Sequence, residues 1–389
     1  MKRNKKRFFR FAFRGVVALT VIITCLSLGI VEISAYESET MPDEYLDFIE
    51  GIEGSVADKL PDGIFSNDAD EVNNAAQALT DPINILSVLI EAVGEGISDV
   101  APTLATVLGT VFVAALINSF SSSLGGISRA VETCVRLCTF CVLSASATAR
   151  VEVFREYLDN LLAAVSSFLP LCATAYAMGG NLTSAAGSVA SLGAILTVCE
   201  LFCTRAAIPI FSVCLCLSLL SAFDGWEIGA GGAISSLIRK WYLRALSFVM
   251  MLLTSSLGAQ TLLSSRADGM AMRSFKFVAS SFVPVSGGTV SSTLGTLASS
   301  VELLRGSIGV VGIVIIILML LPVIVELALL RLVFSVGCFC SSSLGCSREA
   351  RLLGELDSLY GYLEGIAILS AVIFLVVFGI FASVATPFS

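Results

Sequence analysis

The stretch Ile308–Phe334, IGVVGIVIIILMLLPVIVELALLRLVF, contains only two charged residues, Glu326 and Arg331. A helix of about 20 residues spans the roughly 30 Å hydrocarbon core of a bilayer, so this stretch predicts a transmembrane helix. Comparable apolar stretches, many rich in Ser, Gly, Ala and Thr, follow one another from Pro102 onward. We therefore expect an all-α, polytopic membrane bundle of about six to eight helices, with at least one helix broken or re-entrant.

The composition of the whole chain supports this prediction. Of the 389 residues, 56% are hydrophobic and 14% are charged, against about 45–50% and about 25% in ordinary soluble domains. There is no histidine, which excludes Ser-His-Asp and Cys-His catalysis and imidazole metal sites. The sequence also lacks a Walker-type phosphate loop, a GxGxxG after a strand, paired CxxC motifs and HExxH. We predict no enzyme: no catalytic, cofactor-binding or metal-binding residues, and no nucleic-acid partner.

Residues 1–35 have the pattern of a secretory signal peptide. They contain seven basic residues and one acidic residue, and the run from Gly15 to Val31 is apolar. We expect cleavage after Ala35; the alternative is an uncleaved anchor helix. In either case the positive-inside rule places residue 36 and those after it outside the cytoplasm.

The acidic character of the chain belongs to one segment. Residues 36–100 hold sixteen acidic residues and one basic residue, whereas residues 101–389 hold fourteen acidic and fifteen basic residues. Helical spacing in EYLDFIEGI and DPINILSVLIEAV predicts a small, partly helical, acidic extracytoplasmic region. This region either caps the membrane body, docks on a partner or forms a loosely ordered leader.

The cysteines do not indicate a disulfide framework. Of the twelve, all but Cys25 lie at or beyond Cys134, and the acidic segment on the oxidising side contains none. They fall inside apolar runs, so we interpret them as small hydrophobic packing residues rather than metal ligands.

Two central blocks of the chain have similar sequences in the same order. GGISRAVETCVRL begins at Gly125 and GGAISSLIRKWYLRAL at Gly231, while SSFLP begins at Ser166 and SSFVP at Ser280. This order predicts an internal duplication; chance similarity between low-complexity apolar sequences is the alternative. The expected divisions are a first membrane repeat at 101–224, a second at 225–340, and a polar loop with a C-terminal transmembrane helix at 341–389.

Proline and paired glycines in the middle of each repeat predict broken helices. Backbone groups freed by such a break must be buried in protein or face water. The alternative is a plain kink or an interfacial loop. The candidate broken-helix or conduit-lining residues are Pro170, Gly179, Gly180, Pro284, Gly287 and Gly288.

Acidic residues also precede arginines by three to five positions around the apolar runs, so that each pair can lie on one helical face. Charges in membranes usually face the bundle interior or a water-filled cavity. Structural pairing, snorkelling, lining of a conduit and binding of a subunit are all open for them. The candidate intramembrane charges are Glu200 with Arg205, Glu302 with Arg305, and Glu326 with Arg331.

The signal peptide, the acidic leader, the multi-pass body and the segment Phe275–Leu297, FKFVASSFVPVSGGTVSSTLGTL, resemble the stage III sporulation protein AE family of endospore-forming Firmicutes. The resemblance implies a membrane subunit of the channel or secretion-like complex between mother cell and forespore, required for forespore development. It also implies the mother-cell membrane around the forespore as the location, and other membrane proteins of that complex as partners. It supplies no catalytic residues.

Two other functions are open. One is a stand-alone secondary transporter or permease, which duplicated halves with broken helices would also suit. The other is an assembly scaffold that conducts nothing. In all three cases the chain lies in a lipid bilayer, and self-association into a homo-oligomer is a further expectation.

Overall fold

The computed structural model describes residues 43–50, 60–66, 68, 71–72, 74–75, 82–121, 128–178, 182–220, 230–282 and 287–383, without the side chains of 260–307 and of some shorter stretches. The predicted signal peptide, Gly179, Gly180 and Pro284 lie outside these residues. The short elements are helix α2 (Asp43–Glu50) and the 3₁₀-helix η1 (Asp62–Phe65). The other elements are α5 (Pro82–Ser121), α6 (Ser128–Met178), α7 (Leu182–Cys199), the π-helix η3 (Glu200–Ala206), α8 (Ala207–Leu220), α9 (Ala230–Phe282), α10 (Gly287–Ser343) and α11 (Ser347–Ser383).

The long helices are much longer than a bilayer requires. α11 contains 37 residues and α10 contains 57, so at 1.5 Å per residue they measure about 55 and 85 Å. Six helical stretches in the described part are long and apolar enough to cross a membrane, which confirms the predicted all-helical, multi-span architecture. These candidate spans are residues 90–120, 137–178, 189–218, 232–259, 308–343 and 347–381.

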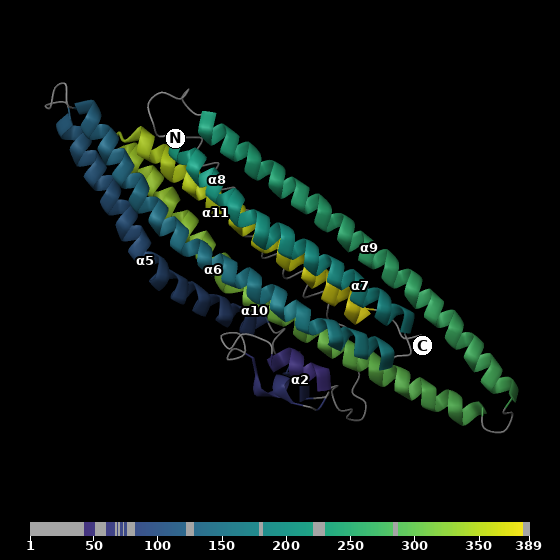
Figure 1. Cartoon of the computed structure of the whole chain (residues 1–389). Helices are drawn as coiled ribbons and strands as arrows, with labels where there is room; N and C mark the ends of the chain where they lie inside the picture. The colour runs from purple at the N-terminus through teal and green to yellow at the C-terminus, as the bar shows by residue number, and fades with distance from the viewer. Residues whose placement is uncertain are drawn as a thin grey trace.

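The helices lie side by side, and α7, η3 and α8 form one continuous stretch. Apart from this stretch, successive helices run in opposite directions (Figure 1). The most extensive contact is between α10 and α11, and α5 packs along α10. α7 packs against both α6 and α9, while α5 and α9 form opposite edges of the bundle in Figure 1. The most apolar part of the sequence therefore forms the core of the helical bundle. Nearly every residue from Ile308 to Leu320 is buried.

The contact between α10 and α11 depends on one glycine. The Phe378 ring occupies the space beside Gly312, where an added Cβ would lie 1.9 Å from its Cε1 atom. Phe378 itself is 1% exposed. A side chain at position 312 would therefore push the two central helices apart.

A tight turn joins these two helices. Gly345 has φ 83°, a conformation that favours glycine. The Cys346 N–H donates to the Ser341 carbonyl at 2.9 Å and the Gly345 N–H to the Ser342 carbonyl at 3.4 Å, which is the hydrogen-bond pattern of a Schellman motif. The run SSSLGCS at 341–347 thus ends α10 and starts α11 within three residues.

The short α2 helix in the acidic segment is docked on the bundle. It packs against α6, where the Phe48 and Phe168 rings meet edge to face with centroids 5.8 Å apart. Tyr45 donates a 2.8 Å hydrogen bond to the Ile64 carbonyl. Because Tyr45 and Phe48 are almost completely buried, this segment is anchored by apolar packing despite its acidic composition.

The predicted break at Pro170 is wrong, because α6 runs through this residue to Met178. Pro170 is exposed, whereas Phe168 and Leu171 beside it are buried. Packing of these neighbours holds the helix although proline removes one backbone hydrogen bond. Gly287 and Gly288 are the first residues of α10 rather than the middle of a helix.

Two expected domain boundaries coincide with helices. α5 continues without a break through residue 100, and α10 continues through residue 340. The acidic segment and the first candidate span therefore share one helix.

Candidate functional site

Three arginines inside the bundle pair with carboxylates on other helices. We call this set the buried ionic network, although only Arg239 is fully buried and the other side chains are 14% to 25% exposed. It links α6, α9, α10 and α11, although each of its residues lies within a candidate span. Its members are Arg150, Arg239, Arg331, Glu326, Glu355, Asp357 and Glu364.

Arg331 of α10 holds two carboxylates of α11. Its Nε lies 3.3 Å from Asp357 Oδ1, and its Nη1 donates to Glu364 Oε2. The guanidinium lies against the α11 backbone at Gly361, where an added Cβ would be 3.1 Å from Arg331 Cζ. Asp357, Gly361 and Glu364 are spaced by four and three residues, so they share one helix face. Gly361 thus leaves the room in which Arg331 reaches both acids.

Arg150 of α6 links α5 and α10. Its Nη1 donates to Glu326 Oε1 at 3.0 Å, and its Nη2 donates to the Asp99 carbonyl at 2.5 Å. The Arg150 and Glu326 side chains are 25% and 16% exposed. A single arginine therefore satisfies a carboxylate of one helix and a backbone carbonyl of another.

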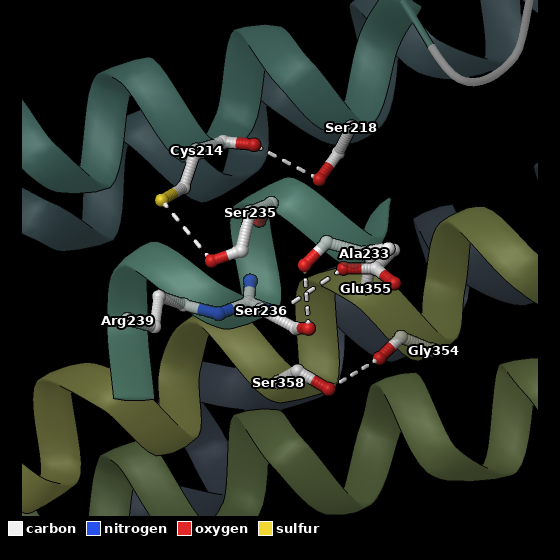
Figure 2. A network of polar contacts seen from close by, with 9 residues as sticks. All are labelled: Cys214, Ser218, Ala233, Ser235, Ser236, Arg239, Gly354, Glu355 and Ser358. Carbon is white, nitrogen blue, oxygen red and sulfur yellow. Dashed lines mark hydrogen bonds and ion pairs between the residues drawn. The ribbon is translucent and has the colours of Figure 1, made fainter. Parts of the chain in front are cut away.

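Arg239 of α9 pairs with Glu355 of α11. The Nη2–Oε2 distance is 3.1 Å, and the Arg239 side chain is 6% exposed. Figure 2 shows the pair between α9 and α11, with Cys214 and Ser235 close by. Cys214 Sγ contacts the Ser235 carbonyl at 3.8 Å. Within the described part of the chain, Arg239 Nη1 and Ser235 Oγ have no hydrogen-bond partner.

A glycine also makes room for this second pair. An added Cβ at Gly232 would lie 2.8 Å from Glu355 Oε1. Position 232 on α9 therefore has to be small for Glu355 to lie beside Arg239. The same device, a glycine opposite a charged side chain, occurs at Gly361 and at Gly232.

Three tyrosines attach the same region of α11 to its neighbours. Tyr362 donates to the Ala207 carbonyl at 3.3 Å, and Tyr157 donates to the Ala367 carbonyl at 3.4 Å. Tyr242 donates to the Phe202 carbonyl, and its ring centroid lies 5.7 Å from that of Tyr362. These bonds satisfy hydroxyls that would be costly to bury without partners.

The pair Glu200–Arg205 is confirmed, with Arg205 Nη2 2.7 Å from Glu200 Oε1. In a regular α-helix residues five apart are about 140° apart around the axis, but these two lie in the π-helix η3, whose wider turn brings i and i+5 together. Pro209 follows η3 and offers no N–H to the carbonyl at position 205, which disfavours the regular register there. Unlike the network, this pair is exposed, at 49% for Glu200 and 71% for Arg205.

The predicted pairing of Glu326 with Arg331 along one helix is wrong. Glu326 pairs with Arg150, and Arg331 pairs with Asp357 and Glu364. α10 is a regular α-helix here, so the five-residue spacing points the two side chains to different neighbours. The side chains of Glu302 and Arg305 lie outside the described residues.

Sequence reasoning missed most of the network. The residues that sequence patterns do not single out are Arg150, Arg239, Glu355, Asp357 and Glu364. The available signal was an isolated arginine within an apolar run, as at Arg150 and Arg331, because such a residue requires a partner in a membrane. Which residue is that partner depends on helix packing.

The cysteines contribute no cluster to this site. The structure shows no disulfide among the eleven described cysteines, five of which are buried. Among the described residues there is no group of three or more Cys, Asp or Glu side chains placed to hold a metal ion. The chemistry of the site is therefore that of charge pairs inside an apolar bundle.

The fold and the network define a multi-pass α-helical membrane protein whose central helices are joined by buried ion pairs. Its membership is shown by the family model for stage III sporulation protein AE, which matches residues 70–385. The chain belongs to this family.

The chain is also similar, over a shorter stretch, to a relative that has the name of this family. The stage III sporulation protein AE of Bacillus subtilis (strain 168) is 22% identical over 162 residues, which is 42% of this chain and 40% of the relative. The aligned part thus spans about two fifths of that relative's length. No solved structure matches the chain.

Proposed function

We propose that this chain is a membrane subunit of the channel or secretion-like complex between mother cell and forespore. Membership of the family gives a role in sporulation, and the six candidate spans give a multi-pass membrane protein. What we propose beyond this is that the chain belongs to the channel complex and lies in the mother-cell membrane around the forespore. Its partners are the other membrane proteins of the complex.

The observation that carries the proposal is the buried ionic network. Buried ion pairs rarely add stability compared with apolar packing, and ionisable residues inside a membrane usually mark a functional pathway or interface. Here they join helices of both expected repeats: Arg150 comes from the first, and Glu326, Arg331 and Arg239 come from the second.

The arrangement of the helices supports duplicated halves. α6 is followed by the continuous stretch α7–η3–α8, and α9 is followed by α10. The first helices of the two blocks are similar in length, with 51 and 53 residues. Each connects to its successor within a few residues, where the sequence carries the glycine pairs. We propose that the two halves enclose the conduit or its base and that the chain has no catalytic role.

The direct test is affinity purification of the full chain from sporulating cells. We expect several other membrane proteins of the complex to co-purify, and the purified chain alone to move no solute in proteoliposomes. Solute uptake by the chain alone would replace the proposal with a transporter, and purification without membrane partners would contradict it.

A second test addresses the network. In a sporulating host without its own AE protein, Glu326→Gln is expected to reduce the yield of mature spores while the variant remains in the membrane. The matched control is Glu200→Gln, which makes the same change at an exposed pair. A normal yield with Glu326→Gln, or equal losses for both variants, would show that the network does not carry the function.

A further inference from the structure

We propose that this chain associates with further copies of itself through an acidic face on α6 and a basic face on α9. The acidic face is Glu152 and Glu156, and the basic face is Lys240 and Arg244. All four are exposed, and no ion pair is formed by any of them within the described residues. This self-association does not depend on the proposed membership of a larger complex.

The position of these charges is the first argument. Glu152 and Glu156 lie in the candidate span 137–178, and Lys240 and Arg244 lie in the span 232–259. Charged side chains in such segments normally face the protein interior and pair with one another, as the buried ionic network does. Charges that face outward on these helices without an ion-pair partner among the described residues are available to another polypeptide.

The two faces also have equal and opposite charge. On α6 the neighbouring Arg155 and Asp159 pair with each other at 3.8 Å, which leaves the two glutamates unbalanced. On α9 the two basic residues are unbalanced, because Arg239 is paired with Glu355. A face of two negative charges thus matches a face of two positive charges.

The two faces lie at the same height in the bundle. Tyr242, between Lys240 and Arg244, packs against Tyr362 of α11. Tyr157 donates to Ala367, five residues further along α11, and Glu152 is five residues before Tyr157. Because α6 and α11 run in the same direction in Figure 1, Glu152 and Tyr242 are both level with Tyr362.

The directions and spacings agree as well. α6 and α9 run in the same direction, with α7 packed between them, and α5 lies at the edge opposite α9 (Figure 1). In both faces the charges are four residues apart, or about 6 Å along the helix axis. When α6 of one copy lies along α9 of the next, Glu152 therefore faces Lys240 and Glu156 faces Arg244.

Contact between two different faces of the same chain is head-to-tail rather than self-complementary. Such contacts close into a ring when the copies are related by rotation without translation. The equal height of the two faces meets that condition and places the ring axis along the bundle. Exposed Ala163 and Ser166 continue the α6 face below Glu156 and allow a neighbouring helix to approach closely.

Anionic lipid headgroups are the main competing occupant. They would cover Lys240 and Arg244, but they would be repelled by Glu152 and Glu156. A second copy supplies both signs at once, so it accounts for both faces.

The test uses charge reversal on the full chain in nanodiscs of phosphatidylcholine, with native mass spectrometry as the readout. We expect the wild type to form an oligomer. The variants Glu152→Lys/Glu156→Lys and Lys240→Glu/Arg244→Glu should each weaken the association by about tenfold or more, because like charges then meet. Arg351→Glu, an exposed charge reversal at the start of α11, is the control and should assemble like the wild type.

Mixing the two reversed variants gives the decisive result. Neither reversed variant should associate with itself. In the mixture, the lysines on α6 of one variant can pair with the glutamates on α9 of the other, and the unchanged α9 and α6 faces can pair as in the wild type. Co-expression with two different tags should therefore restore association, with the copies alternating. A monomeric wild type, unchanged assembly of the variants, or no restoration on mixing would overturn the proposal. Oligomers that form only with added phosphatidylglycerol and respond only to the Lys240 and Arg244 changes would assign the basic face to lipid instead.

Discussion

Arg331 Nε lies 3.3 Å from Asp357 Oδ1, and this contact joins through charge the two helices that carry the most apolar candidate spans. The guanidinium also reaches Glu364 across the bare backbone of Gly361. The Arg331, Asp357 and Glu364 side chains are 14%, 22% and 16% exposed. One cation is therefore shared by two carboxylates in surroundings that otherwise exclude charge.

Removing Arg331 alone should lower the free energy of unfolding more than replacing Arg331, Asp357 and Glu364 together. Arg331→Gln leaves Asp357 and Glu364 without their arginine, and we expect a loss of about 3–5 kcal/mol in the free energy of unfolding. The triple variant Arg331→Met/Asp357→Leu/Glu364→Met should recover most of that loss, because apolar packing replaces the ion pairs. Thermal unfolding in detergent measures both. A triple variant as unstable as the single one would contradict this account.

The space at Gly361 can be tested separately. Gly361→Leu should displace the Arg331 guanidinium and destabilise the protein by about 2 kcal/mol or more. Gly354→Leu is the matched control on α11, since no atom lies within 4 Å of an added Cβ there. The comparison of the two melting temperatures decides the matter; equal shifts would mean that the effect belongs to the helix and not to the arginine.

The contact between Gly312 of α10 and Phe378 of α11 predicts that a smaller residue at position 378 will offset the effect of a larger one at position 312. Gly312→Ala places a methyl group in the Phe378 ring, so we expect destabilisation of about 1–3 kcal/mol. Replacing Phe378 by Leu in the same chain should reduce that penalty, because the shorter side chain vacates the space. A double-mutant cycle of unfolding free energies measures the coupling. Additive effects would show that the two positions do not contact each other.

Docking of α2 on α6 should weaken at alkaline pH. Burial raises the pKa of Tyr45 above its usual value of 10.0, so the undocked segment loses its phenolic proton at a lower pH than the docked one. Docking is therefore fully stable below about pH 10 and weakens as the pH rises above it. Protection of the segment from protease across this range is the measurement.

Tyr45→Phe provides the control for this pH effect. The variant cannot ionise, so its protection should no longer fall at alkaline pH for this reason. It also loses the hydrogen bond to the Ile64 carbonyl, which should weaken docking by about 1 kcal/mol at neutral pH. The same alkaline loss in the variant would assign the effect to another group.

Much of the fold could be predicted because its signals are local. The apolar run at Ile308–Phe334 is long enough to specify a membrane helix without reference to any other part of the chain. The spacing of Glu200 and Arg205 likewise allowed a local pair, which forms within the π-helix η3. Pro170 shows the limit of local reasoning, since buried neighbours on α6 keep the helix intact.

The sequence by itself determined that the chain is a helical membrane protein, because hydropathy and segment length act within each helix. Only the tertiary structure decided which charge meets which. Arg150 and Glu326 are 176 residues apart in the sequence, and Arg239 and Glu355 are 116 apart. No periodicity connects such positions, because their pairing depends on which helices become neighbours and how each is rotated about its axis. The same packing also leaves Glu152 of α6 and Lys240 of α9 exposed.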